Sequence, residues 1–392
     1  MKRFEVYACN GRVSIKSTRL MEAKTALSKP KIILISPTAG TMAQFERAGF
    51  ASRQVSLIRE YAKYFDVEYY TSDVRDYSKP LQVKHRPLPV RLDVPGLRHL
   101  LFWLYLVIRA PFMKGPIRTF GVEIPTLPLI RMLSGQKIIV GFQWDYASTT
   151  RANYKGTKRW LANSLQGLGF AGADLVICTA DRLKVIAEEN YGKKAVVIPN
   201  FVDFGLFNKS PEKEDYILYA GRLHWAKGID VLLSAFKGIC AACPGYRLLI
   251  CGAGEMETSL KETVAREKIE NVEFLGSVKQ DRLAGLVARA KVFVLPTTTS
   301  EGHPKALIEA MASGTACVAT RVPGNRDIIS DNVNGKLVEP GDADALSKTA
   351  ISIINDVRMR IELETAGYQS AREFSLQKVI RREAELLKNS LA

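Results

Sequence analysis

Two glutamates are the first candidates for ligand-binding groups in this sequence. Glu301 lies in a polar turn after the buried run from Val292 to Leu295, and Glu309 lies in the helix-forming stretch that follows. A carboxylate accepts hydrogen bonds from vicinal hydroxyls and repels phosphate. Acids at the two ends, with bare helix N–H groups between them, indicate a site for a sugar nucleotide. The alternative is a capping acid and a solvated helix glutamate.

A helix must begin between these two acids. We expect Pro304 at its first position, a helix to about Ser313 and a stop at Gly314. From Pro304 to Glu309 the axis rises about 7–8 Å, at ~1.5 Å per residue. That separation suits a diphosphate over the helix terminus and a ribose further along it.

Two cations follow another predicted strand, Tyr216 to Ala220. Arg222 and Lys227 lie between Gly221 and Gly228, ahead of a helix that begins near residue 229. Open α/β sheets bind ligands at the carboxyl ends of their strands. Arg222 can grip a diphosphate through two parallel N–H bonds, and Lys227 adds a point charge. Solvated surface cations are the alternative.

Two motifs resemble the retaining group 1 glycosyltransferases of GT-B fold. They are G-R-L-x-x-x-K-G at Gly221 to Gly228 and E-G-x-P-x-x-L-x-E-A-M-A-x-G at Glu301 to Gly314. The likeness covers roughly residues 175–373 well and the amino-terminal half in outline. It implies that Arg222 and Lys227 bind the donor diphosphate, Glu309 the ribose and Glu301 the transferred sugar. Further donor contacts are expected from Gly221, Gly276, Val278, Gly302, His303, Pro304, Lys305, Ala306 and Leu307.

Residues for the sugar or the acceptor are sought in the amino-terminal half. In the resembling family, the loop after the first core strand lies by the donor phosphates and the acceptor, and Gly49 is in that loop here. Gln143 and Asp145 follow the strand from Lys137 to Phe142. Many relatives carry a histidine in this region, and this chain does not, so that contact is not carried over. Asp145 is the candidate for touching the sugar or the acceptor hydroxyl.

Length and strand pattern predict an α/β fold of two doubly wound domains, and the resemblance implies that they are Rossmann-like and face each other across a cleft. The chain has 392 residues, and its second half alternates buried strands with helical patterns. We expect an extension over 1–30, an acceptor domain over 31–208 and a donor domain over 209–374. The last segment, 375–392, resembles the helix that crosses back to the first domain in this fold.

Positive charge is concentrated in the amino-terminal half. Residues 1–200 carry 31 Lys and Arg against 15 Asp and Glu, whereas residues 201–392 carry 25 of each. This favours anionic partners such as phospholipid headgroups or lipid-linked phosphates, and a merely soluble basic surface is the alternative. The apolar stretch from Leu97 to Ile108 is too short to span a bilayer. We expect a buried helix there, with a helix dipping into the membrane interface as the alternative. No secretory signal opens the chain, so the expected location is the cytoplasm, at the inner membrane face.

No metal or cofactor is expected. Cys240-Ala-Ala-Cys243 is a lone pair, and Asp342-Ala343-Asp344 is interpreted as a helix start. The expected function is transfer of a sugar from a nucleoside-diphosphate sugar to a glycan or lipid-linked acceptor, in polysaccharide or glycolipid synthesis. The alternatives are a sugar-nucleotide hydrolase or epimerase and a non-catalytic sugar-nucleotide sensor. A nucleic-acid-binding protein is third, since no nucleic-acid motif accompanies the charge.

Overall fold

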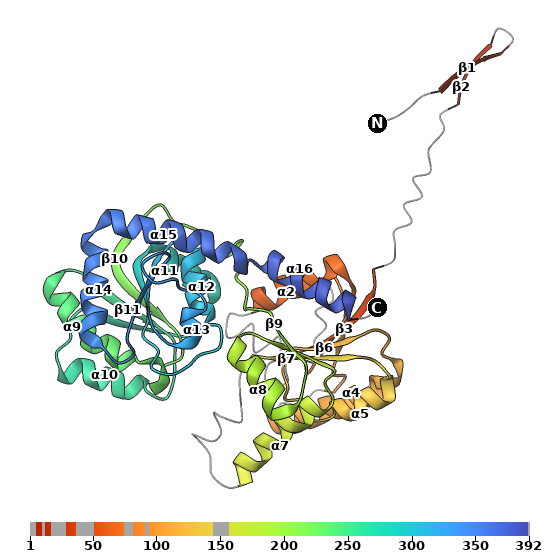
Figure 1. Cartoon of the computed structure of the whole chain (residues 1–392), viewed down its shortest axis with the longest axis horizontal. Helices are drawn as coiled ribbons and strands as arrows, with labels where there is room; N and C mark the ends of the chain where they lie inside the picture. Colours follow the sequence, from red (N-terminus) through yellow and green to blue (C-terminus); the bar gives the residue numbers. More distant parts are fainter. Residues whose placement is uncertain are drawn as a thin grey trace.

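The computed structural model describes residues 5–9, 12–16, 29–36, 51–73, 81–90, 94–143 and 157–390. Two α/β lobes lie side by side, and each is built on one parallel sheet (Figure 1). This confirms the predicted fold class. Ahead of the first lobe, β1 (Glu5–Cys9) and β2 (Arg12–Lys16) pair as an antiparallel hairpin.

The first lobe has the strand order β5-β4-β3-β6-β7-β8-β9, with all neighbours parallel. Its strands are β3 (Lys31–Ile35), β4 (Asp66–Thr71), β5 (Lys84–Pro87), β6 (Ile117–Thr119), β7 (Ile138–Phe142), β8 (Leu175–Cys178) and β9 (Ala195–Val197). Its helices are α2 (Ala51–Tyr64), α4 (Pro95–Arg109), η1 (Ala110–Phe112), α5 (Leu127–Ser134), α7 (Thr157–Ala171) and α8 (Asp181–Tyr191). Both faces of the sheet are buried, which explains why β3, β7 and β8 contain continuous apolar runs.

The second lobe has the order β12-β11-β10-β13-β14-β15, again parallel throughout. Its strands are β10 (Glu214–Ala220), β11 (Arg247–Cys251), β12 (Val272–Gly276), β13 (Ala290–Leu295), β14 (Ala316–Thr320) and β15 (Lys336–Val338). Its helices are η2 (Trp225–Lys227), α9 (Ile229–Ala242), α10 (Glu257–Arg266), α11 (Gln280–Arg289), α12 (Lys305–Ala312), α13 (Pro323–Arg326), α14 (Ala343–Asn355), α15 (Val357–Ala371) and η3 (Arg372–Phe374). The chain leaves β10 toward β11 and later returns to β13, so the strand order reverses between β10 and β13.

The last helix, α16 (Leu376–Asn389), crosses from the second lobe to the first, as the resemblance implied. It packs against α2, and its buried residues, among them Val379 and Ile380, join the core under the first sheet (Figure 1). At its centre Glu383 accepts a 2.6 Å hydrogen bond from Nε of Arg118 on β6, and the two side chains are only 5% and 4% exposed. Burial opposes the charge of this arginine, but the Glu383 carboxylate outweighs it and raises the Arg118 pKa.

Two expectations about helices are corrected. Pro304 is not the first residue of α12 but the residue before it, in an extended conformation. The helix expected to be buried over residues 97–108 is buried on one face alone. Phe102 and Leu106 lie in the core, whereas Leu100 and Leu104 are exposed. An unbroken apolar run cannot reveal which of its faces meets the sheet, because periodicity is the signal for that and here it is missing.

Candidate functional site

Most of the predicted donor residues follow β10 and β13, the two strands between which the strand order of the second lobe reverses. The segment after β10 and the segment after β13 lie side by side, since the Thr298 N–H donates to the carbonyl of Ala226 at 3.0 Å. Gly228 makes this approach feasible. It has φ +64°, and a Cβ there would lie 2.1 Å from the Pro296 carbonyl oxygen. The reversal point is where doubly wound sheets bind ligands, because two loops diverge there and leave a crevice.

Lys227 and Glu301 meet at this point. Nζ of Lys227 lies 2.7 Å from Oε1 of Glu301, with the side chains 21% and 11% exposed. The Thr297 hydroxyl donates to the same carboxylate oxygen. Two groups predicted from motifs more than seventy residues apart are therefore one structural unit. The carboxylate orients the ammonium group, and the pair is open enough to meet a ligand.

Arg222 lies two residues after the end of β10 and is exposed. Its backbone is fixed, because the Tyr219 hydroxyl donates to the Arg222 carbonyl at 2.9 Å and Gly221 donates to Cys251 at 3.0 Å. Within the described residues the Arg222 side chain has no ion-pair partner. A rigid backbone with an uncommitted guanidinium suits the capture of an anion.

The helix α12 begins four residues after Glu301 in the chain. Pro304 provides no side-chain cap, so the first N–H groups of the helix are not taken by a capping side chain. Lys305 is the first residue of the helix, and burial lowers its pKa to about 7, with the nearby Arg53 contributing. Ala306 is partly buried against the core and Leu307 is fully buried, so these two residues contribute backbone and packing.

The side chain of His303 has a structural role. Burial lowers its pKa to about 4, which keeps the imidazole neutral. The ring packs against Phe374 with centroids 4.9 Å apart, and the amide of Asn200 donates to the His303 carbonyl. Position 303 therefore offers its backbone N–H, and no positive charge, to a ligand.

Glu309 lies next to Arg53, a residue that the sequence analysis did not identify. Nη1 of Arg53, on α2 of the first lobe, lies 4.0 Å from Oε1 of Glu309, with the side chains 15% and 10% exposed. The guanidinium sits over the ring of Phe201, 5.0 Å from its centroid. Burial raises the pKa of Glu309, while Arg53 and Lys305 counteract the shift. No sequence motif links residues 256 positions apart, so only the fold could reveal this contact.

The first lobe also touches the turn after Glu301. A Cβ placed on Gly302 would lie 3.4 Å from the Thr179 hydroxyl oxygen and 3.6 Å from the Gln143 carbonyl oxygen. The Gln143 backbone is therefore next to the donor-side turn, as its choice as a sugar or acceptor contact requires. Gly49 and Asp145 lie outside the described residues.

Gly276 and Val278, two of the expected donor contacts, lie at the edge of the second sheet. Gly276 ends β12 with φ +64°, and its carbonyl accepts the Gly252 N–H at 2.8 Å. Val278 is half-buried against the core. Gly252 begins the turn after β11 with φ +145°, as expected for a tight strand-to-helix connection.

The described residues form neither a metal site nor a disulfide between Cys240 and Cys243. They contain no group of three or more His, Cys, Asp or Glu that could hold a metal ion. Cys240 and Cys243 are free thiols. Asp342 caps α14 by accepting the Ala345 N–H at 2.8 Å, which confirms the helix start.

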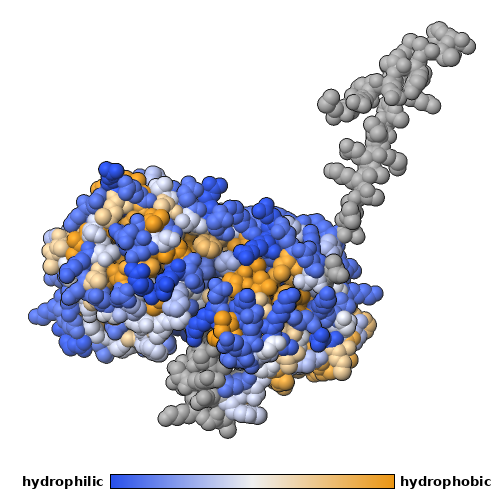
Figure 2. Space-filling view, in the orientation of Figure 1, coloured by the Kyte–Doolittle hydropathy of each residue, from blue (hydrophilic) through white to orange (hydrophobic). Residues whose placement is uncertain are grey.

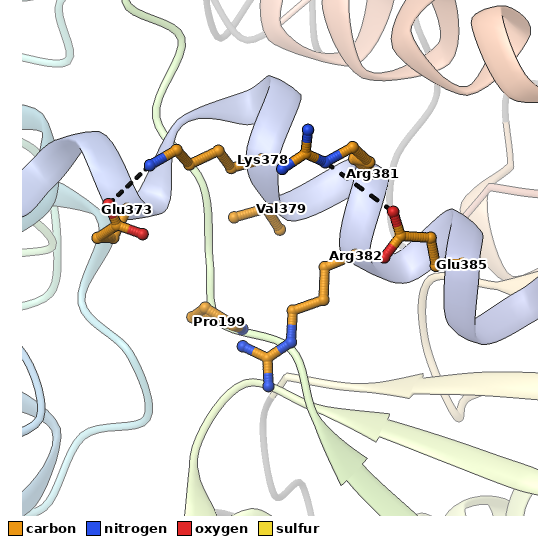
Figure 3. A pocket seen from close by; sticks show the side chains of 7 residues that line it. All are labelled: Pro199, Glu373, Lys378, Val379, Arg381, Arg382 and Glu385. Carbon is orange, nitrogen blue, oxygen red and sulfur yellow. Dashed lines mark hydrogen bonds and ion pairs between the residues drawn. The ribbon is translucent and has the colours of Figure 1, made fainter.

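A separate pocket lies where α16 passes Pro199 (Figure 3). Two ion pairs line it, Lys378 with Glu373 and Arg381 with Glu385, and the Arg382 side chain extends toward Pro199. The residues that line it include none of the predicted donor residues, so we assign the pocket to the crossing between lobes rather than to the site.

Gly228 offers a test of the loop arrangement. We expect Gly228→Ala to destabilise the protein by roughly 1–3 kcal/mol, because the residue must keep a positive φ and its methyl group would collide with the Pro296 carbonyl. Gly285→Ala is the matched control. It lies inside α11 with nothing within 4 Å of the added Cβ, so up to about 1 kcal/mol of stabilisation is expected. Thermal unfolding of both variants measures the difference, and equal midpoints would contradict the arrangement.

Solved structures define the class of the fold. The model superposes on HepE of Anabaena, solved in complex with UDP and glucose, with a TM-score of 0.71 and 17% identity over 92% of this chain and 100% of that chain. It also superposes on the sucrose-phosphate synthase of Thermosynechococcus elongatus, with a TM-score of 0.72 and 19% identity over 92% and 99%. Two facing Rossmann-like lobes of this arrangement are the GT-B fold.

Sequence comparison finds a similar family. The model of the family described as glycosyl transferases group 1 matches residues 207–370. Residues 207–370 of this chain are therefore similar to the glycosyl transferases of group 1. It is 34% identical over 267 residues to a phosphatidyl-myo-inositol mannosyltransferase of Mycolicibacterium smegmatis, covering 65% of each chain. It is 27% identical over 225 residues to an uncharacterised glycosyltransferase of Methanocaldococcus jannaschii, covering 56% of this chain and 62% of the relative. The matches thus span less than two thirds of these relatives' length.

Proposed function

We propose that this protein is a glycosyltransferase that moves a sugar from a nucleoside-diphosphate sugar to a glycan or lipid-linked acceptor, with retention of configuration. The observation that carries the proposal is the Lys227–Glu301 pair, 2.7 Å apart, at the reversal point of the donor sheet, with Glu301 four residues before α12. Cations and bare N–H groups suit the diphosphate, and the carboxylate suits the sugar hydroxyls.

The roles of these groups follow from where charge develops. Breaking the bond between the anomeric carbon and the diphosphate leaves cationic character on the sugar and negative charge on the leaving group. Arg222, Lys227 and the α12 terminus would stabilise the leaving diphosphate. Glu301 would orient the sugar rather than attack it, since Lys227 and Thr297 already hold its Oε1. A donor phosphate oxygen would take the proton of the acceptor hydroxyl.

Glu309 would accept hydrogen bonds from the ribose, and the segment around Gly276 and Val278 would lie against the base. Gln143, Asp145 and Gly49 would serve the sugar or the acceptor. Gln143 is favoured by the closeness of its backbone to Gly302. The relatives that are named as phosphatidylinositol glycosyltransferases support a lipid-linked acceptor. No described helix is both long and apolar enough to cross a bilayer, and we propose peripheral contact with the inner membrane face.

A panel of nucleoside-diphosphate sugars tests the proposal. A donor at 100 times its dissociation constant adds about 2.7 kcal/mol of stability, which a thermal-shift measurement detects. The best donor is then incubated with candidate acceptors, and the product's mass and anomeric configuration are determined. Turnover that needs an acceptor supports a transferase. Donor cleavage at the same rate without one would favour the hydrolase alternative, and binding without any cleavage would favour a sensor.

A further inference from the structure

One face of α4 is apolar and exposed along the whole helix. Leu97, Leu100, Leu104 and Ile108 recur at spacings of three and four residues, and 43 to 60% of their surface is exposed. Such spacing places them on a single stripe. The opposite face, with Phe102 and Leu106, fills the core. A surface helix ordinarily has polar residues where this stripe lies.

The stripe continues onto neighbouring elements. Phe112 in η1 follows directly, and α5, which packs against both α4 and η1, exposes Leu129, Met132 and Leu133. In Figure 2 hydrophobic side chains lie at the lower right edge of the molecule, where Figure 1 places α4 and α5. We call these eight residues the α4–α5 face. A contiguous exposed patch of this kind marks an interaction site.

The charge near the α4–α5 face is mainly basic. Residues 94–137 contain six Lys and Arg and a single acidic residue, Glu123, but Arg118 is buried against Glu383 and Arg131 pairs with Asp174, which leaves four basic residues without such a partner among the described ion pairs. Lys114 is exposed beside η1, and Arg109 closes the last turn of α4. Apolar side chains ringed by basic residues are the composition of helices that lie in a membrane interface.

We propose that the α4–α5 face docks this protein on an anionic lipid bilayer, with α4 lying in the plane of the surface. Charge favours this occupant over a second copy of the chain, because a two-fold contact would bring one basic patch against another. Fifteen residues of helix are also too short to cross the hydrocarbon layer. This docking rests on the proposed function, for which it names the membrane-binding surface. A protein that binds the donor but not the bilayer would contradict the docking alone.

Vesicle sedimentation of the full chain tests this docking. The test variant is Leu100→Gln with Leu104→Gln and Ile108→Gln, and all three positions are exposed. The matched control is Val333→Gln with Val357→Gln and Ile361→Gln, equally exposed apolar residues of the second lobe. Vesicles of phosphatidylglycerol mixed with phosphatidylcholine should pellet the wild type and the control. We expect at least a tenfold loss of binding for the test variant, and weaker wild-type binding to phosphatidylcholine alone.

Three results would overturn the docking inference. They are equal binding by the test variant and the wild type, no wild-type binding to anionic vesicles, and a wild-type dimer that the test variant converts to a monomer. The last would make the α4–α5 face a contact between copies. Each protein is also tested for its thermal shift with the best donor. A normal shift shows that the variant folds, and its absence in the wild type would count against the proposed function instead.

A different observation concerns Arg53 in the cleft. Its Nη2 is buried without a hydrogen-bond partner in the described structure, and its Nη1 is 4.0 Å from Glu309, beyond hydrogen-bond distance. Lys305 lies close enough to repel it. Two cations thus share one carboxylate in a confined space. The Arg53 guanidinium also lies over the ring of Phe201, which helps to hold it in place. An anionic ligand bound there would compensate this excess of buried positive charge.

We infer that Arg53 is a donor-positioning residue that reaches across the cleft to the diphosphate when the donor is bound. This rests on the proposed nucleotide-sugar site. Its ligand is the diphosphate, because Arg53 lies close to Lys305, the first residue of α12, and the proposed function places the diphosphate at that helix terminus. The donor would then be held by both lobes at once, with Arg222 and Lys227 on one side and Arg53 on the other.

Titration of UDP and GDP, each against its nucleoside, tests the role of Arg53. For whichever diphosphate binds the wild type, Arg53→Gln should weaken affinity at least tenfold, Arg53→Lys less, and the nucleoside not at all. Arg59→Gln, an exposed arginine on the same helix, is the control. An unchanged diphosphate affinity, or equal weakening of diphosphate and nucleoside, would refute the inference. Failure of the wild type to bind either diphosphate would count against the proposed function.

Discussion

Replacing Lys227 with alanine is expected to lower kcat/KM for sugar transfer by about 10²- to 10³-fold. Removing one group that stabilises charge in a transition state typically costs ~3–4 kcal/mol. Lys227 is placed for that task by the 2.7 Å contact with Glu301 and by the Gly228 turn. The variant also leaves the Glu301 carboxylate without its cation, so the sugar would be held less firmly. Steady-state kinetics with the best donor and acceptor measure the loss.

Lys261→Ala provides the control for this experiment. Lys261 is a half-exposed lysine of the same lobe, also paired with a glutamate, Glu257, at 2.7 Å. Its loss should leave kcat/KM within about twofold, because surface pairs contribute little. Were Lys227→Ala to be as active as Lys261→Ala, the diphosphate would have to bind elsewhere.

Removing one partner of the Arg118–Glu383 pair should cost about 3–5 kcal/mol of folding free energy. Glu383→Ala leaves the Arg118 guanidinium buried without its counter-charge, in a place that water does not reach. Nε of Arg118 donates to Glu383, and the guanidinium also donates to the Thr119 carbonyl and lies over the Phe120 ring. Urea denaturation followed by circular dichroism measures the change.

Two companion variants separate burial from ion pairing. Glu373→Ala breaks the exposed pair with Lys378 and should leave the stability close to that of the wild type. The double variant Arg118→Met with Glu383→Leu removes both charges, and its stability should return close to the wild-type value, because apolar groups of similar size need no solvation. A loss below 1 kcal/mol for Glu383→Ala would mean that α16 does not depend on this pair.

The donor lobe could be predicted from the sequence because its signals are local. Most of its strands contain a short apolar run, glycines follow β10 and β11, and the acids and cations stand next to strand ends, whereas β15 (Lys336–Val338) was not predicted. The strand at 292–295 was found within a few residues of β13, and Gly314 ends α12 with φ +62° as expected. Once the sheet is parallel, strand ends meet at one edge, so motifs distant in the chain come together without further information.

The unpredicted features depend on contacts between distant segments. Arg53 could not be linked to Glu309, nor Arg118 to Glu383, because each pair joins different parts of the chain through packing. The sequence of α4 could not show which of its faces is exposed, because apolar residues occur all round the helix. Its leucines lie on both sides of the helix, and only the position of the sheet decides which of them are buried. His303 was similarly assigned to the donor site before its ring was known to pack on Phe374.

The crossing of α16 has a consequence for how the polypeptide is made. Glu383 leaves the ribosome 265 residues after Arg118. At a synthesis rate of 5–20 residues per second this is a delay of roughly 10–50 s. Throughout that interval the underside of the first sheet lacks its final cover, whereas the second lobe acquires all its strands before the interval ends. The half that is translated first is therefore the half that matures last, and nascent chains would need protection from aggregation at that uncovered surface.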